Sequence, residues 1–85
     1  MGKQEKLRNR LLSKPKDFTW SEMNSLLGNL GFELLKGSGS KRKFVHNETK
    51  TIIIIHEPHP GNILKRYIIE QVTTKLVEME LIDNE

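Results

Sequence analysis

Apolar residues recur at helical spacing in two stretches of the N-terminal third of the chain. The first, residues 3–14, carries a thin apolar stripe made of Leu7, Leu11 and Leu12. We expect a short basic helix there, loosely docked or partly frayed, because few apolar side chains can be buried. The second covers residues 19–30, and its Thr19 and Glu22 have the spacing of a capping box. Gly31 follows at the position of a glycine C-terminal cap, so the pattern predicts a well-defined helix.

A third helical pattern lies near the C-terminus, over residues 63–80. Its apolar positions are three and four residues apart and comprise Leu64, Tyr67, Ile68, Val72, Leu76 and Met79. Residues 56–61 contain two prolines and a glycine, which stop helix and strand alike. Asn62 is a good capping residue, so we expect a long amphipathic helix capped by Asn62. Residues 81–85 are expected to fray.

Three short runs between the helices have the composition of β-strands. They cover residues 32–36, 41–46 and 51–55. Alternation in the second run places Phe44 on one face and Lys41 and Lys43 on the other. The uninterrupted isoleucines of the third predict a central strand, or one covered on both faces. The short connections favour an antiparallel meander.

These elements predict an α+β fold in which two amphipathic helices cover one face of a three-stranded antiparallel sheet. Eighty-five residues form a single domain. Within it we expect an N-terminal helix or extension at residues 1–17, a core at residues 18–80 and a tail at residues 81–85. The other face of the sheet is expected to stay open.

Composition narrows the class of protein. The absence of cysteine excludes disulfides and thiolate metal sites. No apolar run approaches the roughly 18–20 residues of a membrane span, and residues 1–13 are charged rather than signal-like. We therefore expect a cytoplasmic protein without a membrane partner.

The net charge of +3 is unevenly distributed. Five cations and one carboxylate, Glu48, lie between residues 36 and 50, whereas residues 78–85 carry four carboxylates and no cation. Such a basic centre indicates a face that binds a polyanion. The alternative is an ordinary solvated charged surface.

A glycine–serine turn, residues 37–40, opens directly into three cations and Phe44. Glycine allows a sharp turn with exposed N–H groups, which together with adjacent cations favours phosphate. With Phe44 buried, Lys41 and Lys43 project outward, since the opposite register would bury both lysines. Alternatively, these lysines only discourage edge-to-edge aggregation. The candidate RNA-binding residues are Lys36, Gly39, Ser40, Lys41, Arg42, Lys43 and Lys50.

Three histidines are the other candidates for chemistry. His46 ends the second strand on the side of Phe44 and is expected to be structural, while His56 closes the third strand and His59 lies in the proline loop. The spacing of His56 and His59 allows metal binding, but no carboxylate or thiol cluster completes a site. We therefore expect no metal and no cofactor. A histidine can also serve as a general acid or base.

The chain resembles the HicA toxins of HicAB toxin–antitoxin modules over about residues 19–78. The best-matched segments are residues 32–40, with the glycine–serine turn, and residues 59–65, His-Pro-Gly-Asn-Ile-Leu-Lys. The helix at residues 3–14 falls outside this core. The resemblance implies a fold similar to double-stranded-RNA-binding domains, with α-β-β-β-α order. It also implies a metal-free endoribonuclease that cleaves mRNA and is neutralised by a HicB-like antitoxin.

One departure from the family concerns the catalytic residue. The family motif usually has the catalytic histidine directly after Gly-Ser, whereas here Lys41 follows Gly39-Ser40. Lysine can stabilise charge on phosphorus, and His59 or His46 can supply the acid–base function. We assign Lys41 and His59 as the catalytic pair. His59 matches a second, non-catalytic histidine of the family, whose other role is to anchor its loop.

Three functions remain open from the sequence. The first is an mRNA-cleaving toxin, and the second is a non-catalytic RNA-binding module on the same fold. The third is a protein-interaction module whose basic face binds an acidic partner.

Overall fold

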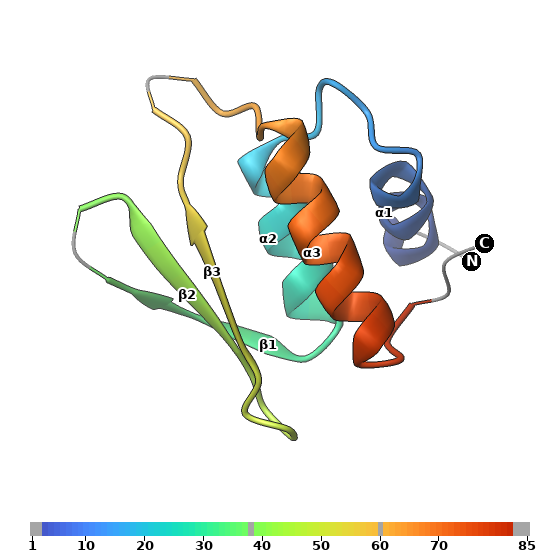
Figure 1. Ribbon diagram of the computed structural model, residues 1–85, viewed down its shortest axis with the longest axis vertical. Helices are drawn as coiled ribbons and strands as arrows, with labels where there is room; N and C mark the ends of the chain where they lie inside the picture. The colour runs from blue at the N-terminus through green and yellow to red at the C-terminus, as the bar shows by residue number, and fades with distance from the viewer. Residues whose placement is uncertain (1–2, 38, 60, 83–85) are drawn as a thin grey trace.

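The computed structural model describes residues 3–37, 39–59 and 61–82 (Figure 1). Its elements, in chain order, are α1 (Lys3–Leu12), α2 (Trp20–Asn29), β1 (Phe32–Lys36), β2 (Lys41–His46), β3 (Ile52–His56) and α3 (Arg66–Glu78). The predicted α+β class and the order of helices and strands are confirmed. The tail residues 83–85 lie outside the described part of the chain, and so does Ser38 of the predicted turn.

The three strands form an antiparallel sheet in the order β1-β2-β3. Phe44 of β2 pairs with Leu34 on one side and Ile53 on the other. The central strand is therefore β2, and the prediction that the isoleucine run is central is wrong. Ile52 and Ile54 are exposed, so β3 is covered on one face only. The isoleucine run reflects β-branched propensity for the strand conformation rather than two-sided burial.

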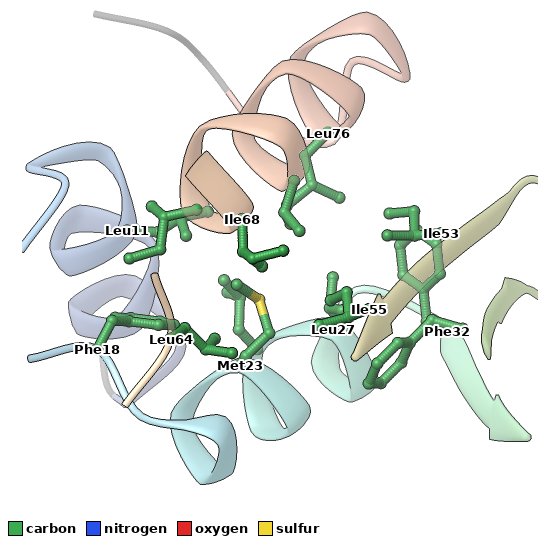
Figure 2. Close-up of a cluster of buried hydrophobic side chains, with 14 of the residues drawn as sticks. Leu11, Phe18, Met23, Leu27, Phe32, Ile53, Ile55, Leu64, Ile68 and Leu76 are labelled. Carbon is green, nitrogen blue, oxygen red and sulfur yellow. The ribbon is translucent and has the colours of Figure 1, made fainter. Parts of the chain in front are cut away.

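Helices α2 and α3 cover one face of the sheet, and α1 lies on the far side of these helices (Figure 1). The other face stays open, as the alternating burial of β3 shows. Figure 2 shows the side chains between the layers converging into one core. Phe44, at the centre of the sheet, lies 1% exposed with its ring centroid 5.7 Å from that of Trp20. This burial confirms the predicted register, in which Lys41 and Lys43 belong to the open face.

The predicted capping box of α2 is present. The Glu22 backbone N–H donates to the Thr19 hydroxyl at 3.1 Å, and the Thr19 N–H donates to the Glu22 carboxylate at 3.0 Å. These bonds satisfy backbone donors that the first helical turn leaves without partners. Gly31, after the helix, has a φ of +97°. The positive φ lets the chain reverse directly into β1, as a glycine cap does.

Helix α1 is docked more firmly than its thin apolar stripe predicts. Leu11 is fully buried, and Arg10 Nε lies 2.8 Å from Glu22 Oε2 of α2. Burial raises the pKa of Glu22. The Thr19 N–H and the Arg10 guanidinium together lower it by more, so the pKa of Glu22 lies below its usual value. An ion pair and one fully buried leucine thus compensate for the scarcity of apolar residues.

Helix α3 begins at Arg66, so the predicted start at residue 63 and the Asn62 cap are wrong. The segment before α3 is instead extended and pairs with the segment before α2. The Trp20 N–H donates to the Asn62 carbonyl at 2.7 Å, and the Leu64 N–H donates to the Phe18 carbonyl at 2.9 Å. These bonds hold residues 62–64 in an extended conformation, so α3 begins about one turn later in the chain than predicted. The starts of α2 and α3 are therefore fixed beside each other.

Two side chains of the C-terminal part differ from expectation. Tyr67 is 62% exposed, and Ile69 is fully buried in its place. The buried residues of α3 are Ile68, Ile69, Val72, Thr73 and Leu76, and at 3.6 residues per turn Tyr67 lies on the opposite side of the helix. Ile82, in the segment expected to fray, is buried and packs against the core.

Candidate functional site

The β1–β2 turn is closed by its own backbone. The Gly37 N–H donates to the Lys41 carbonyl at 2.9 Å, and Gly39 has a φ of +57°. The glycine at residue 39 therefore adopts the left-handed conformation that the sequence predicts for this turn. The Gly37 N–H is used to close the turn, so it does not point outward as a phosphate donor.

Arg42 ties the turn to the loop that follows β3. Its guanidinium donates to the carbonyls of Gly39 at 2.8 Å and Lys41 at 3.0 Å. The same group lies 3.0 Å from the Glu57 carboxylate. In turn, the Glu57 N–H donates to the Ser40 carbonyl at 2.8 Å. The side chain of Arg42 is only 17% exposed, so its position is set by the fold.

Three lysines surround the locked turn. Lys36 ends β1 opposite Arg42, while Lys41 and Lys43 extend from the open face of β2. Among the residues that the structure describes, no carboxylate forms an ion pair with any of these three. Lys50 lies at the other end of the sheet, in the β2–β3 hairpin, roughly 17 Å away by the rise of a β-strand. The structure thus groups the predicted cations but leaves Lys50 apart.

The three histidines have different surroundings. His46 is 5% exposed, and its Nε2 donates to the Leu30 carbonyl at 3.1 Å. Its Nδ1 accepts from the Thr49 N–H at 3.3 Å, so both ring nitrogens are engaged and the predicted structural role is supported by the geometry. His59 is exposed in the loop after β3. His56 is exposed at the end of β3, directly opposite Lys41.

Two concave regions lie along the loop that follows β3. One, of about 270 Å³, is lined by Gly39, Ser40, Arg42, Glu57, Pro58 and His59. The other, of about 410 Å³, extends from His56 and His59 to Tyr67 at the start of α3. Glu57, Pro58 and His59 line both regions, so the two regions meet at the loop after β3 and bring both exposed histidines and Tyr67 to one stretch of surface. No group of three or more potential metal ligands occurs in the described ranges.

The family model that describes the HicA toxin of bacterial toxin–antitoxin systems matches residues 20–79. The chain belongs to the HicA toxin family. The match runs from the start of α2 to the residue after α3, so α1 lies outside the family core. Comparisons with curated proteins and with solved structures gave no significant match. None of the described helices is long and apolar enough to cross a membrane.

Within this HicA-family fold, most of the sequence-predicted site residues meet at one end of the sheet. Lys36, Gly39, Ser40, Lys41, Arg42, Lys43 and His59 belong to this end. Their roles in binding and catalysis stay predictions. Lys50 and His46 belong to the opposite end, where the β2–β3 hairpin begins.

Two residues beside the turn were not selected from the sequence. His56 was considered as the end of the third strand and as a metal ligand with His59, and Tyr67 was assigned to the buried face of α3. The strand alternation contained a signal for His56, because it shares the parity of Ile52 and Ile54 and hence the open face. A signal for Tyr67 also existed, because at 3.6 residues per turn it lies off the stripe formed by Ile68, Val72 and Leu76.

Proposed function

We propose that this HicA-family toxin is an endoribonuclease that cleaves mRNA at the β1–β2 turn. The observation that supports this proposal most strongly is that Lys41 and Lys43 share the open face of the sheet with the exposed imidazole of His56, which lies directly opposite Lys41. RNA cleavage through the 2′-hydroxyl needs a group that moves the proton and a charge that stabilises the phosphorane oxygens. The turn end of the sheet offers both kinds of group within one surface.

Lys41 is assigned as the main phosphate contact, with Lys43 and Lys36 on the flanking phosphates. An ammonium group binds phosphate through charge-assisted hydrogen bonds and compensates the negative charge that builds up during attack on phosphorus. Gly39 and Ser40 shape the turn. Arg42 contributes to the local positive charge even though its guanidinium already bonds the turn and Glu57.

His59 and Tyr67 are assigned to the larger concave region. His59 supports the acid–base work from the loop after β3. Tyr67 exposes its ring beside it, and an exposed aromatic side chain can stack on an unpaired RNA base. A single-stranded stretch of mRNA therefore suits this surface better than a continuous duplex.

The partner is proposed to be a HicB-like antitoxin in the cytoplasm that blocks this surface. The family membership supports a toxin–antitoxin pairing. Among the described residues, Glu57 is the carboxylate that pairs with a cation of the basic turn, and the lysines beside it favour an antitoxin segment that is rich in carboxylates.

A non-catalytic RNA-binding module is the second candidate function. It is favoured by one observation, which is that Lys41 follows Gly39-Ser40 where the family usually has its catalytic histidine. Such a module binds RNA through the same lysines, and its affinity falls steeply with salt. It leaves the RNA intact.

The two candidates are separated by incubating the purified protein with labelled mRNA in the presence of a chelator. We expect cleavage by the wild type, a loss of at least tenfold in Lys41→Ala, and no change in Lys6→Ala. Lys6 is an exposed lysine on α1, on the far side of the helices from the sheet, so it controls for the loss of one positive charge. Salt-sensitive binding of intact RNA without products would favour the binding module instead.

Expression in a host cell is the second test. We expect growth arrest by the wild type, relief of the arrest in Lys41→Ala and relief on co-expression with the antitoxin. Arrest by Lys41→Ala at wild-type strength would contradict the assigned role of Lys41.

A further inference from the structure

One contact at the turn joins two strands through side chains. The Ser40 hydroxyl lies 3.3 Å from Nδ1 of His56. Ser40 directly precedes β2, and His56 is the last residue of β3. The imidazole therefore stands beside the turn although it comes from a different strand.

The sheet register places His56 directly opposite Lys41. Phe44 of β2 and Ile55 of β3 are buried on the helix-covered face. Lys41 and His56 have the opposite parity in the same strands, so both belong to the open face. Residues opposed in this way have their Cβ atoms roughly 4.5–5.5 Å apart. A phosphate bound by the Lys41 ammonium can thus lie within reach of the His56 ring.

The backbone holds this pair rigidly. The Glu57 N–H donates to the Ser40 carbonyl at 2.8 Å, directly after His56. The carboxylate of Glu57 also meets Arg42, which bonds the turn carbonyls. A catalytic group must be held within a fraction of an ångström of its productive position. The backbone and side-chain bonds at the ends of β2 and β3 restrict the position of His56 in this way.

We propose that His56 is the proton acceptor for RNA cleavage, with Ser40 as the residue that positions its ring. This inference rests on the proposed ribonuclease function and names the group that performs its first proton transfer. The sequence assigned that work to His59 or His46.

The reaction has one bond-forming and one bond-breaking event. The neutral His56 ring removes the proton from the ribose 2′-hydroxyl, and the 2′-oxygen attacks the adjacent phosphorus. The bond between phosphorus and the 5′-oxygen breaks, and its electron pair stays on that oxygen, which takes a proton from His59 in its protonated form. The products are a 2′,3′-cyclic phosphate and a free 5′-hydroxyl. Lys41 compensates the charge on the non-bridging oxygens throughout.

Ser40 suits both states of the ring. A hydroxyl can donate to Nδ1 of a neutral imidazole or accept from an Nδ1–H, so the contact survives when the ring gains a proton. Nε2 is then the nitrogen available for the substrate, because none of the residues in the described ranges bonds to it. His46 lacks such a free nitrogen, since its Nε2 and Nδ1 are both bonded within the fold.

The test compares wild-type protein with His56→Ala, His56→Gln, His59→Ala and Ile52→Ala on one labelled RNA. Ile52 is an exposed residue of the same strand and face, at the end away from the turn, and serves as the matched control. Rates are measured between pH 5 and 8, and binding is measured on RNA whose 2′-hydroxyls are methylated. Circular dichroism checks that each variant is folded.

We expect His56→Ala and His56→Gln to lose about 10²–10⁴-fold in cleavage rate, the usual contribution of a general base. Binding of methylated RNA should change less than about threefold, and added imidazole should restore part of the rate to His56→Ala. Ile52→Ala should cleave like the wild type. Both His56 variants should stay well below the wild-type cleavage rate at every pH between 5 and 8, because no other residue takes over the proton transfer.

Failure of the inference and failure of the proposed function have different results. If the wild type cleaves and both His56 variants cleave within threefold of it, His56 is not the proton acceptor, and the ribonuclease function stands. If His59→Ala loses activity and both His56 variants keep it, His59 in the loop after β3 is the proton acceptor, and the inference is likewise overturned. If the folded wild type binds RNA and produces no cyclic phosphate, the ribonuclease function fails, and the role of His56 fails with it.

Discussion

The buried histidine, His46, allows the fold to be tested independently of function. Its ring bonds the Leu30 carbonyl at the end of α2 and the Thr49 N–H in the β2–β3 hairpin. It also lies edge-on to Phe32, with the ring centroids 4.9 Å apart. The side chain therefore joins three elements, and His46→Ala removes all three contacts at once.

The expected loss can be estimated from these contacts. Leaving the Leu30 carbonyl without a donor costs about 1–3 kcal/mol, and the aromatic contact contributes about 0.5–1.5 kcal/mol. Because the surroundings partly relax, we expect His46→Ala to lower the free energy of unfolding by about 2–4 kcal/mol. In a domain of this size, that corresponds to a fall in Tm of roughly 10–25 °C.

Urea unfolding followed by circular dichroism measures this loss. His56→Ala is the matched control, and its exposed ring should change the free energy of unfolding by less than about 0.5 kcal/mol. His46→Phe separates the contributions, since it keeps an aromatic ring and loses the hydrogen bonds, at a cost of about 1–3 kcal/mol. The assignment of His46 as a structural residue is refuted if His46→Ala unfolds within about 0.5 kcal/mol of the wild type.

Further predictions concern single residues of the helices. Gly31→Ala should destabilise the protein by about 1–3 kcal/mol in urea unfolding, because a Cβ at φ +97° is strained and would lie 3.2 Å from His46 Nε2. Thr19→Ala should lower the free energy of unfolding by about 1 kcal/mol, since it removes the N-cap oxygen. The pKa of Glu22 is lowered in the fold, so its stabilisation is complete above its unfolded pKa and is lost as the pH falls through the folded pKa. Glu22→Gln should therefore reduce the loss of stability in acid, which thermal unfolding between pH 2 and 6 would detect. Tyr67→Ala should weaken binding of single-stranded RNA by about 1–3 kcal/mol and leave Tm unchanged, as fluorescence anisotropy and thermal unfolding can check.

Much of the fold follows from local patterns in the sequence. The capping box of Thr19 and Glu22, the glycine cap at Gly31 and the alternation around Phe44 each specify one element through nearest neighbours. The start of α3 does not. It depends on the backbone bridge between Thr19 and Ile63, two segments that are 44 positions apart in the chain and become neighbours only in the folded state.

The candidate site shows the same distinction. The cations of the turn are consecutive in the sequence, so their grouping could be predicted. The placement of His56 opposite Lys41 depends on the register of β2 with β3, which short strands and an irregular turn leave undetermined until the sheet forms. The ion pair of Arg42 with Glu57 is likewise a tertiary contact, and it shows that the most central cation is also a structural one.

The location of the RNA site is the central claim, and amide chemical shifts test it most directly. Uniformly ¹⁵N-labelled protein is titrated with single-stranded 2′-O-methyl RNA, which binds without being cleaved. We expect the largest shift changes in residues 39–43 and 56–59, at the turn and the end of β3, and small changes in residues 47–51 of the opposite hairpin. Changes confined to residues 47–51 or to α1, or no saturable change at low salt, would contradict the assignment of the β1–β2 turn as the RNA site.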